Sequence, residues 1–140
     1  MRALSVRRGN LTPEERLEIQ SHVNHTRDFL SVLPWPLELA GVPEIAGAHH
    51  ERLDGSGYPD GLADEQIPLA SRVMTVCDIY DALTSMDRPY RLAISTQAAL
   101  NILEDEARLG LIDGDMVQIF IEGRIYEQVW TIPQVAQQVI

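Results

Sequence analysis

The sequence is short of basic charge and of cysteine, and it lacks long apolar runs; each shortage excludes a class of protein. Its 11 basic residues, all arginine, stand against 21 acidic residues. A general DNA- or RNA-binding protein needs a basic surface to neutralise phosphates, so we expect no DNA or RNA partner. The single Cys77 excludes an internal disulfide framework and is typical of the reducing cytoplasm. No stretch approaches the roughly 20 apolar residues of a membrane span, so we expect no direct insertion into a membrane.

Length and composition indicate one soluble globular domain. A chain of 140 residues, 45% hydrophobic and 23% charged, is long enough to bury a core. It contains no internal repeat, no low-complexity run and no convincing alternating strand pattern. We interpret the absence of lysine as a codon or lineage bias. We expect a single domain over 1–140, with an irregular lead-in at 1–11, a structured region at 12–127 and a tail at 128–140 that the pattern does not place.

Start and stop signals divide the structured region into about five main helices and one shorter one. Thr12-Pro13-Glu14-Glu15 is a capping box with proline at the first helical position, and Pro34-Trp35-Pro36 stops that helix. Ser95 and Asp113 are caps for two later helices. The predicted helices run from Pro13 to Leu33, over 37–40, from Pro43 to the histidine pair His49-His50, from Pro68 to about Ser85, from Thr96 to near Gly110, and from Asp113 onward. The fold class is therefore all-α, a helical bundle whose one elaborate connection is the loop after His50.

Apolar periodicity predicts how two of these helices are buried. The first carries a stripe at helical spacing that includes Val23 and Leu30, and His22 falls inside it, whereas His25 lies at its edge. The helix from Pro68 to Ser85 is apolar almost all round, and such a helix is expected to be buried. Asp78 lies in the middle of that helix, where an isolated carboxylate would be costly to desolvate.

His49 and His50 end a predicted helix, and a glycine-rich loop follows them at once. Adjacent side chains on a helix point about 100° apart, so this pair suits two neighbouring metal ions better than one. Together with His22 and Asp78 they form a set of imidazoles and a carboxylate on facing helices, which is a known way to build a metal site. Such a mixture suits iron, manganese or zinc. The alternatives are a hydrogen-bonded core histidine for His22, an ion-paired or capping carboxylate for Asp78, and a chance doublet.

The stretch HHERLDGSGYPDGL, residues 49 to 62, resembles the diagnostic loop of the HD-GYP family. That family is a branch of the HD metal-dependent phosphohydrolases and cleaves cyclic di-GMP in bacterial second-messenger signalling. The segments LTPEERLEIQSHVNHTRDFL and IPLASRVMTVCDIYDALTSMDRPYR are similar to the flanking family segments, and NILEDEARLGLIDGDMVQIFIEGRIYE looks like the closing helices. The resemblance covers roughly residues 3 to 127. It implies a cyclic di-GMP phosphodiesterase that forms pGpG or GMP, with a helical fold of the HD type.

The resemblance also implies roles for individual residues. His22, His49, His50 and Asp78 match metal-ligand positions, with iron or manganese favoured and zinc an alternative. Arg88 and Arg91 match a segment that contacts ligand phosphate; the alternative is a solvated connection between helices. The family links the loop to shaping the site and to docking diguanylate cyclase partners of the GGDEF type. The loop residues concerned are Asp54, Gly55, Gly57, Pro59 and Gly61.

Three residues of this stretch have further candidate roles. Tyr58 offers a stacking surface for a guanine or a partner protein, or else anchors the loop by packing. Glu51, or Asp54, is a candidate acceptor for an imidazole N–H, which would orient the ring of a metal ligand.

One departure from the family pattern bears on activity. The His-Asp doublet, which supplies two more ligands and a bridging aspartate, is not in the chain. Without it the four remaining groups could hold one metal with open positions, so we expect this chain alone to be weak or inactive. Met1 falls inside what resembles a family segment, which favours a shortened start or a domain fragment. We therefore expect the C-terminal part of a phosphodiesterase, with an upstream sensor or His-Asp segment as its partner. The alternatives are a non-catalytic module that binds cyclic di-GMP or protein, and a plain structural fragment.

Overall fold

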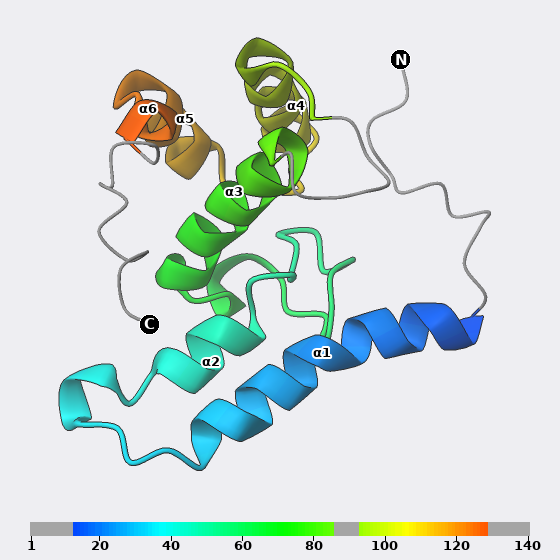
Figure 1. Cartoon of the computed structure of the whole chain (residues 1–140), viewed down its shortest axis with the longest axis vertical. Coiled ribbons are helices and arrows are strands. Elements are labelled where there is room, and N and C mark those ends of the chain that lie inside the picture. Colours follow the sequence, from blue (N-terminus) through cyan, green and yellow to red (C-terminus); the bar gives the residue numbers. More distant parts are fainter. Residues whose placement is uncertain (1–12, 86–92, 129–140) are drawn as a thin grey trace, which may run out of the picture.

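The computed structural model describes residues 13–85 and 93–128, with the backbone alone at 13–17 and 19 (Figure 1). Within these ranges the chain forms six α-helices and two short 3-10 helices, and no strand beyond one isolated bridge between Asp54 and Ala63. The predicted all-α class is therefore confirmed. The elements are α1 (Pro13–Ser31), η1 (Leu37–Leu39), α2 (Val42–Gly47), η2 (Asp64–Gln66), α3 (Leu69–Thr84), α4 (Thr96–Arg108), α5 (Gly114–Glu122) and α6 (Ile125–Gln128).

Local capping explains where the later helices begin. Ser95 Oγ accepts a hydrogen bond from the Ala98 amide at the start of α4, and Asp113 Oδ1 accepts from the amides of Asp115 and Met116 at the start of α5. These side chains satisfy amide groups that have no partner within the helix, as the sequence predicted. The first helix begins at Pro13 and ends before Pro34, also as predicted, while the Thr12 cap lies outside the described residues.

The main apolar core lies between α3, α4 and α5. It contains buried side chains from all three helices and from the α4–α5 connection, namely Val76, Tyr80, Leu83, Ala99, Leu100, Leu103, Ile112, Val117 and Phe120. Tyr80, Phe120 and Tyr126 form an aromatic group with ring centroids 5.2 to 6.1 Å apart, which joins α6 to this core. Within the described residues, no member of this core comes from α1 or α2.

A second, smaller unit is formed by α1 and α2, which pack side by side at the opposite end of α3 from α4 (Figure 1). Their approach is close because position 47 has no side chain: a Cβ on Gly47 would lie 2.7 Å from Arg27 Cδ. Two hydrogen bonds join this unit to α3, from Ser71 Oγ to the Ile45 carbonyl and from Thr75 Oγ1 to the His49 carbonyl. The α1–α2 unit thus depends more on polar links than the core does.

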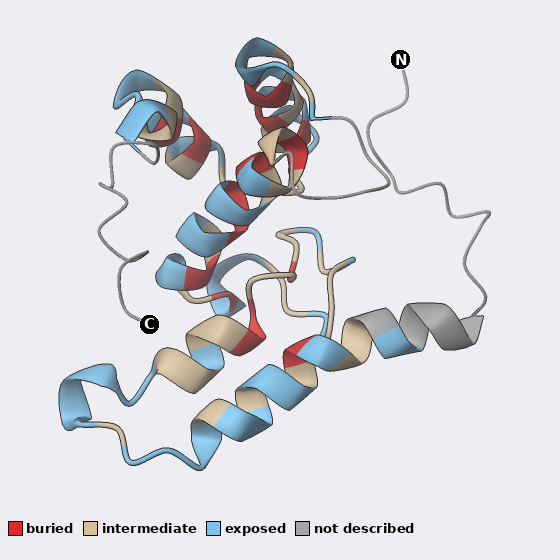
Figure 2. Cartoon of the chain, viewed as in Figure 1, coloured by how far each residue is buried: buried red, intermediate tan, exposed pale blue. Residues whose placement is uncertain are grey.

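The expected burial of α3 on all sides is wrong. Its residues alternate between buried and exposed along the helix (Figure 2), and Leu69 is 61% exposed while Val76 is 1% exposed. The sequence pattern recorded apolar side chains on every face, but α4 and α5 cover only one of them. The stripe on α1 is likewise only partly buried: Val23 is fully buried, whereas Leu30 is half-buried.

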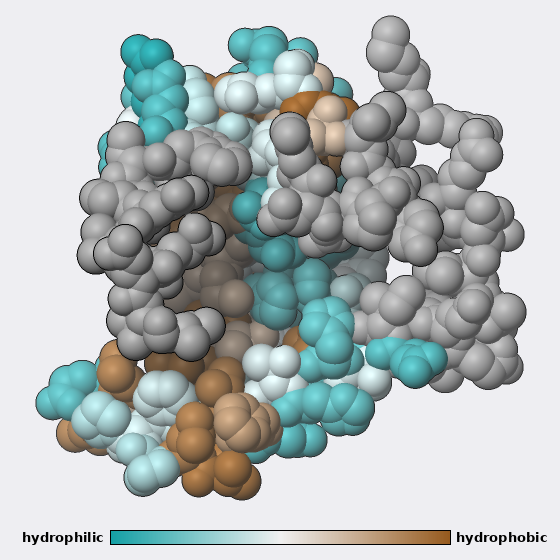
Figure 3. All heavy atoms as spheres, in the orientation of Figure 1, coloured by the Kyte–Doolittle hydropathy of each residue, from teal (hydrophilic) through white to brown (hydrophobic). Residues whose placement is uncertain are grey.

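Apolar surface also gathers where α1 ends and the connection to α2 begins (Figure 3). The exposed side chains there are Phe29, Val32, Leu33, Leu37 and Leu39. Among the described helices, none is both long enough and apolar enough to cross a bilayer.

Replacing Leu103, whose side chain is fully buried in the core, tests this description of the fold. Leu103→Ala should lower the free energy of unfolding by about 2–5 kcal/mol, because it removes buried methyl groups and leaves a cavity. Leu109→Ala at the end of the same helix is the matched control, since Leu109 is 64% exposed; its change should stay within about 0.5 kcal/mol. Urea unfolding followed by circular dichroism measures both, and equal losses would contradict the assigned core.

Candidate metal centre

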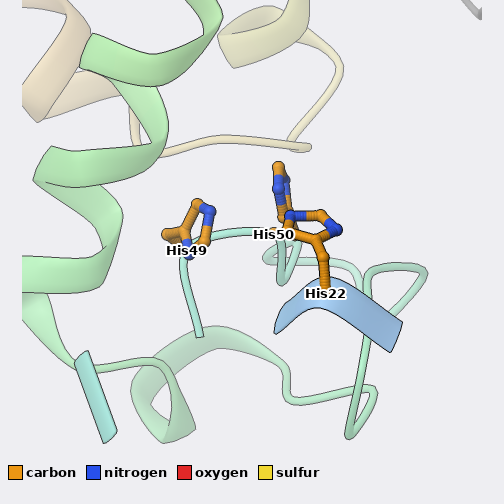
Figure 4. Close-up of side chains that lie close together, drawn as sticks. All are labelled: His22, His49 and His50. Carbon is orange, nitrogen blue, oxygen red and sulfur yellow. The ribbon is translucent and has the colours of Figure 1, made fainter. Parts of the chain in front are cut away.

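Three histidines from two separate parts of the chain meet at one place (Figure 4). His22 comes from α1, and His49 and His50 come from the turn that follows α2. One ring nitrogen from each lies within 4.8 Å of the other two. The ring centroids of His22 and His50 are 5.4 Å apart, with the rings at 76° to each other. The close packing of α1 on α2 thus brings His22 to the doublet.

The conformation of the doublet differs from the sequence-based expectation. The helix α2 ends at Gly47, so His49 and His50 lie on a turn, and their ring centroids are 4.1 Å apart at 40°. The divergence expected for neighbours on a helix does not apply, because the backbone has left the helical conformation at Ala48. Both imidazoles therefore face one space, and the expectation that they diverge as neighbours on a helix is wrong.

Hydrogen bonds fix the backbone and the ring of His49. Its Nδ1 lies 2.6 Å from the carbonyl oxygen of Ala46, and its own carbonyl accepts from Thr75 Oγ1 at 2.7 Å. A proton on Nδ1 satisfies the Ala46 carbonyl and leaves Nε2 as the lone-pair nitrogen, which is the form that binds a metal ion.

The three imidazoles fit a single divalent ion. Nitrogen ligands at 2.0–2.1 Å from a tetrahedral ion lie about 3.4 Å from one another, and the three nitrogens here are already gathered within 4.8 Å. Imidazole is a common ligand for zinc and iron, so the donor set is chemically suitable. Further positions on such an ion would be open to water or to other groups.

Asp78 and His22 are placed differently from the sequence-based expectation. Asp78 is exposed on α3 rather than buried, and it lies outside the group of three ring nitrogens. It is nevertheless close enough for its negative charge to act on His50 and Tyr58. Its role as a metal ligand stays a prediction. His22 is exposed although the pattern places it inside an apolar stripe, and His25, at the edge of that stripe, is also exposed.

His50 is held in the neutral form by its surroundings. The pKa of His50 is lowered from 6.5 to about 4: burial is the largest cause, His49 and His22 also act to lower it, and Asp78 acts to raise it. A neutral imidazole keeps a lone pair at neutral pH, which a metal ligand requires.

The glycine-rich loop folds back against the histidine doublet. The ring of Tyr58 stacks on the ring of His50, with centroids 4.9 Å apart at 24°, and the Tyr58 amide donates to the His50 carbonyl. Burial raises the pKa of Tyr58, and the charge of Asp78 adds to that effect. One face of this ring is therefore occupied within the chain, as expected of a loop anchor. A role for the ring in binding a guanine or a partner protein stays a prediction.

Other loop residues fix the path of the backbone. Asp54 Oδ1 accepts from the hydroxyl and the amide of Ser56, and these two bonds lower the pKa of Asp54. Gly55 and Gly61 have φ of 76° and 68°, in the left-handed region that favours glycine. At Gly57, a Cβ would lie 2.4 Å from the Arg52 amide nitrogen. Pro59 follows Tyr58 in this loop.

Glu51 has a structural role that the sequence reasoning missed. Glu51 is only 2% exposed, and its carboxylate accepts hydrogen bonds from the amides of Asp60 and Leu62. The predicted role was acceptor for an imidazole N–H, whereas these bonds hold the loop. Glutamate is rarely buried unless it is paired. The sequence alone does not show which groups pair with Glu51, so the burial of this side chain could not be judged from it.

Ion pairs attach the loop to the rest of the fold, and none of them was predicted. Arg27 on α1 pairs with Asp60 at 2.6 Å, and Arg52 lies 3.5 Å from Glu106 on α4. The pattern offers no signal for such pairs, because they join positions far apart in the sequence. Arg88 and Arg91, predicted to bind phosphate, lie outside the described residues.

A cavity of about 320 Å³ lies elsewhere, between α4 and α5. It is lined by Glu104, Ala107, Arg108, Gly114, Val117, Gln118, Ile121 and Glu122. None of the predicted site residues borders it. The histidine cluster is therefore assigned on its chemistry and not on a cavity.

Comparison with known families shows which family the chain belongs to. A family model described as HD domain matches residues 1–116. The chain belongs to the HD domain family. The resemblance to HD-GYP proteins is confirmed by similar curated proteins, and metal dependence is a property of the HD domain family.

Three relatives illustrate the similarity of this HD domain chain to proteins of named activity. The cyclic di-GMP phosphodiesterase response regulator RpfG of Xanthomonas campestris is 50% identical over 116 residues, which cover 83% of this chain and 30% of the relative. The 3'3'-cGAMP-specific phosphodiesterase 1 of Vibrio cholerae is 39% identical over 115 residues, 82% of this chain and 26% of the relative. A cyclic di-GMP phosphodiesterase of Thermotoga maritima is 43% identical over 83 residues, 59% of this chain and 22% of the relative. The chain spans about a quarter of the length of the curated relatives it matches.

The low pKa of His50 predicts a pH-dependent stability of the metal-free HD domain chain. Between about pH 6.5 and pH 4 the unfolded chain binds a proton at this position and the folded chain does not, so stability falls as the pH falls through that window. His50→Gln should therefore lose less stability than the wild type on going from about pH 7 to pH 5. Urea unfolding at the two pH values measures this, and parallel losses in both proteins would contradict the assignment.

Proposed function

We propose that this chain is the metal-binding C-terminal part of a phosphodiesterase that hydrolyses a cyclic dinucleotide, with cyclic di-GMP as the favoured substrate. The observation that carries the proposal is the meeting of His22, His49 and His50 around one space. The names of the relatives support the substrate class, since they act on cyclic di-GMP or 3'3'-cGAMP.

In this proposal the three imidazoles hold a divalent ion, with iron or manganese favoured and zinc as the alternative. When bound, such an ion supplies an activated water and stabilises charge on phosphoryl oxygens. Asp78 completes the ligand set from α3; its charge already acts on His50. His49 contributes an Nε2 lone pair that its bond to the Ala46 carbonyl leaves available.

Binding of the dinucleotide requires groups beside the metal. We assign phosphate contacts to Arg88 and Arg91, because a guanidinium offers paired donors that match phosphate oxygens. We propose that one face of the Tyr58 ring contacts a guanine, while the other face stacks on His50. The loop residues Asp54, Gly55, Gly57, Pro59 and Gly61 give this surface its shape.

Full activity requires more ligands than this chain contains. Three imidazoles and one carboxylate can hold a single ion, whereas two ions 3.5–4 Å apart need bridging ligands. The His-Asp doublet of the family supplies such a bridge and is absent from the sequence. We propose that a His-Asp segment outside these 140 residues completes the centre.

A second candidate is a non-catalytic module that binds cyclic di-GMP, or a GGDEF-type protein, through the loop. The observation in its favour is the number of bonds that hold the loop in one shape, through Glu51, Asp54 and the Arg27–Asp60 pair. A surface fixed in advance loses less conformational entropy on binding. For both candidate functions we propose that the protein acts in the cytoplasm.

The assignment of Asp78 as a ligand predicts a loss of metal affinity on its removal. Asp78→Ala should weaken Mn²⁺ binding by at least about tenfold and leave the helical content unchanged, because Asp78 is exposed. Asp81→Ala is the matched control, since Asp81 is an exposed aspartate on the same helix. Titration calorimetry with Mn²⁺ measures both variants, and equal affinities would remove Asp78 from the ligand set.

Hydrolysis itself is tested with the chain alone and with the chain extended to include a His-Asp segment. The extended protein, loaded with iron or manganese, should contain two ions and release pGpG or GMP from cyclic di-GMP, followed by chromatography. The chain alone should release little or none. Parallel assays with 3'3'-cGAMP decide between the two cyclic dinucleotides. Binding of cyclic di-GMP without release by the loaded, extended protein would favour the binding module.

A further inference from the structure

We propose that Glu51 is a positioning residue, whose buried carboxylate orients the His50 imidazole and fixes its distance from His22. The proposal rests on the proposed metal-binding function and adds a residue that acts on the ligands without touching them. It starts from the fact that Glu51 directly follows the doublet and yet turns its side chain into the loop.

The first step is the carboxylate itself. Oε1 accepts from the Asp60 amide at 2.7 Å and Oε2 accepts from the Leu62 amide at 3.0 Å. Hydrogen bonds from N–H groups to an ionised carboxylate are stronger than bonds between neutral groups, and they matter more when they are buried. The two oxygens thus hold both amides of the returning part of the loop against the residue that follows His50.

The second step leads from the loop to the His50 ring. Gly57 lies against the backbone of Glu51 and Arg52, where no side chain would fit, and the next residue, Tyr58, stacks on His50. Because the loop is held on both sides of Tyr58, by the Tyr58 amide bond to His50 and by the bonds at Asp60, its ring has little freedom to leave the imidazole. Glu51 therefore acts on the orientation of His50 through Tyr58.

The third step leads from the loop to α1. Asp60, whose amide is held by Glu51, pairs through its carboxylate with Arg27. Arg27 lies on the same helix as His22, and its aliphatic stem covers Gly47 at the end of α2. The loop thus links the helix that carries His22 to the turn that carries the other two ligands.

Glu51→Gln is the test variant, because it keeps the shape but gives one of the two loop amides a donor in place of an acceptor. The ring protons of His50, measured by NMR in the metal-free protein, should move downfield as the stacked Tyr58 ring is released. Affinity for Co²⁺, followed by its visible absorption, should fall by about tenfold. Glu65→Gln, at an exposed glutamate on the neighbouring η2, is the matched control and should change neither.

A double variant separates positioning from general loss of structure. If Glu51 acts through Tyr58, then Glu51→Gln combined with Tyr58→Leu should weaken Co²⁺ binding less than the product of the two single effects. The proposal would be overturned if the losses of Co²⁺ affinity in the two single variants simply multiply in the double variant. It would also be overturned if a folded Glu51→Gln protein showed unchanged His50 shifts or unchanged Co²⁺ affinity.

Two further outcomes are also decisive. Should Glu51→Gln fail to fold, amide exchange in the wild type takes its place: the Asp60 and Leu62 amides should exchange more slowly than that of Ser56, which bonds to the exposed Asp54. Equal rates would count against the role of Glu51. Should the wild type bind no Co²⁺, the proposed function fails, whereas the His50 shifts still decide whether Glu51 orients that ring.

Discussion

The close approach of α1 to the end of α2 is the contact on which the histidine cluster depends. It is possible because position 47 is a glycine over which the stem of Arg27 lies. A side chain there would meet the Arg27 Cδ, and the Arg27 side chain would have to shift to make room. The geometry of the candidate site thus depends on a packing contact at Arg27, five residues after His22 on α1, and not only on the histidines themselves.

Two parts of the fold are stabilised in different ways. The core of α3, α4 and α5 is apolar and tightly buried, while the region of the histidines is held by hydrogen bonds, ion pairs and stacked rings. Polar links fix directions more narrowly than apolar contacts do, which suits groups that must point at one place. The exposed face of α3, which includes Asp78, borders this polar region.

Much of the fold followed from local signals in the sequence. Proline at the first turn of α1, Ser95 and Asp113 each mark a helix start, because an unpaired amide at a helix end needs an acceptor or must be absent. The loop after His50 followed from its glycines. The burial of α3 could not be inferred, because periodicity gives the character of each face but not the number of neighbours that cover it. Asp78 was therefore placed in a core that does not enclose it.

The sequence predicted which residues form the site better than it predicted how they are arranged. The three histidines were identified, but their relation to one another depended on whether the helix continued through Ala48. Glycine often ends a helix, yet Gly47 was not taken as a stop signal. The structure ends α2 at Gly47. The roles of Glu51 and Arg27 could not be inferred at all, because a charged side chain that binds a distant backbone amide or carboxylate leaves no periodic trace.

The weak attachment of the α1–α2 unit has a consequence for how an occupied site would behave over time. Among the described residues, hydrogen bonds from Ser71 and Thr75 join this unit to α3. A unit held in this way can open as a separate cooperative segment while the aromatic core stays closed. An ion held by ligands on both α1 and the turn would raise the free energy of that partial opening alone. How long the ion stays bound would then depend on this partial opening rather than on unfolding of the whole protein.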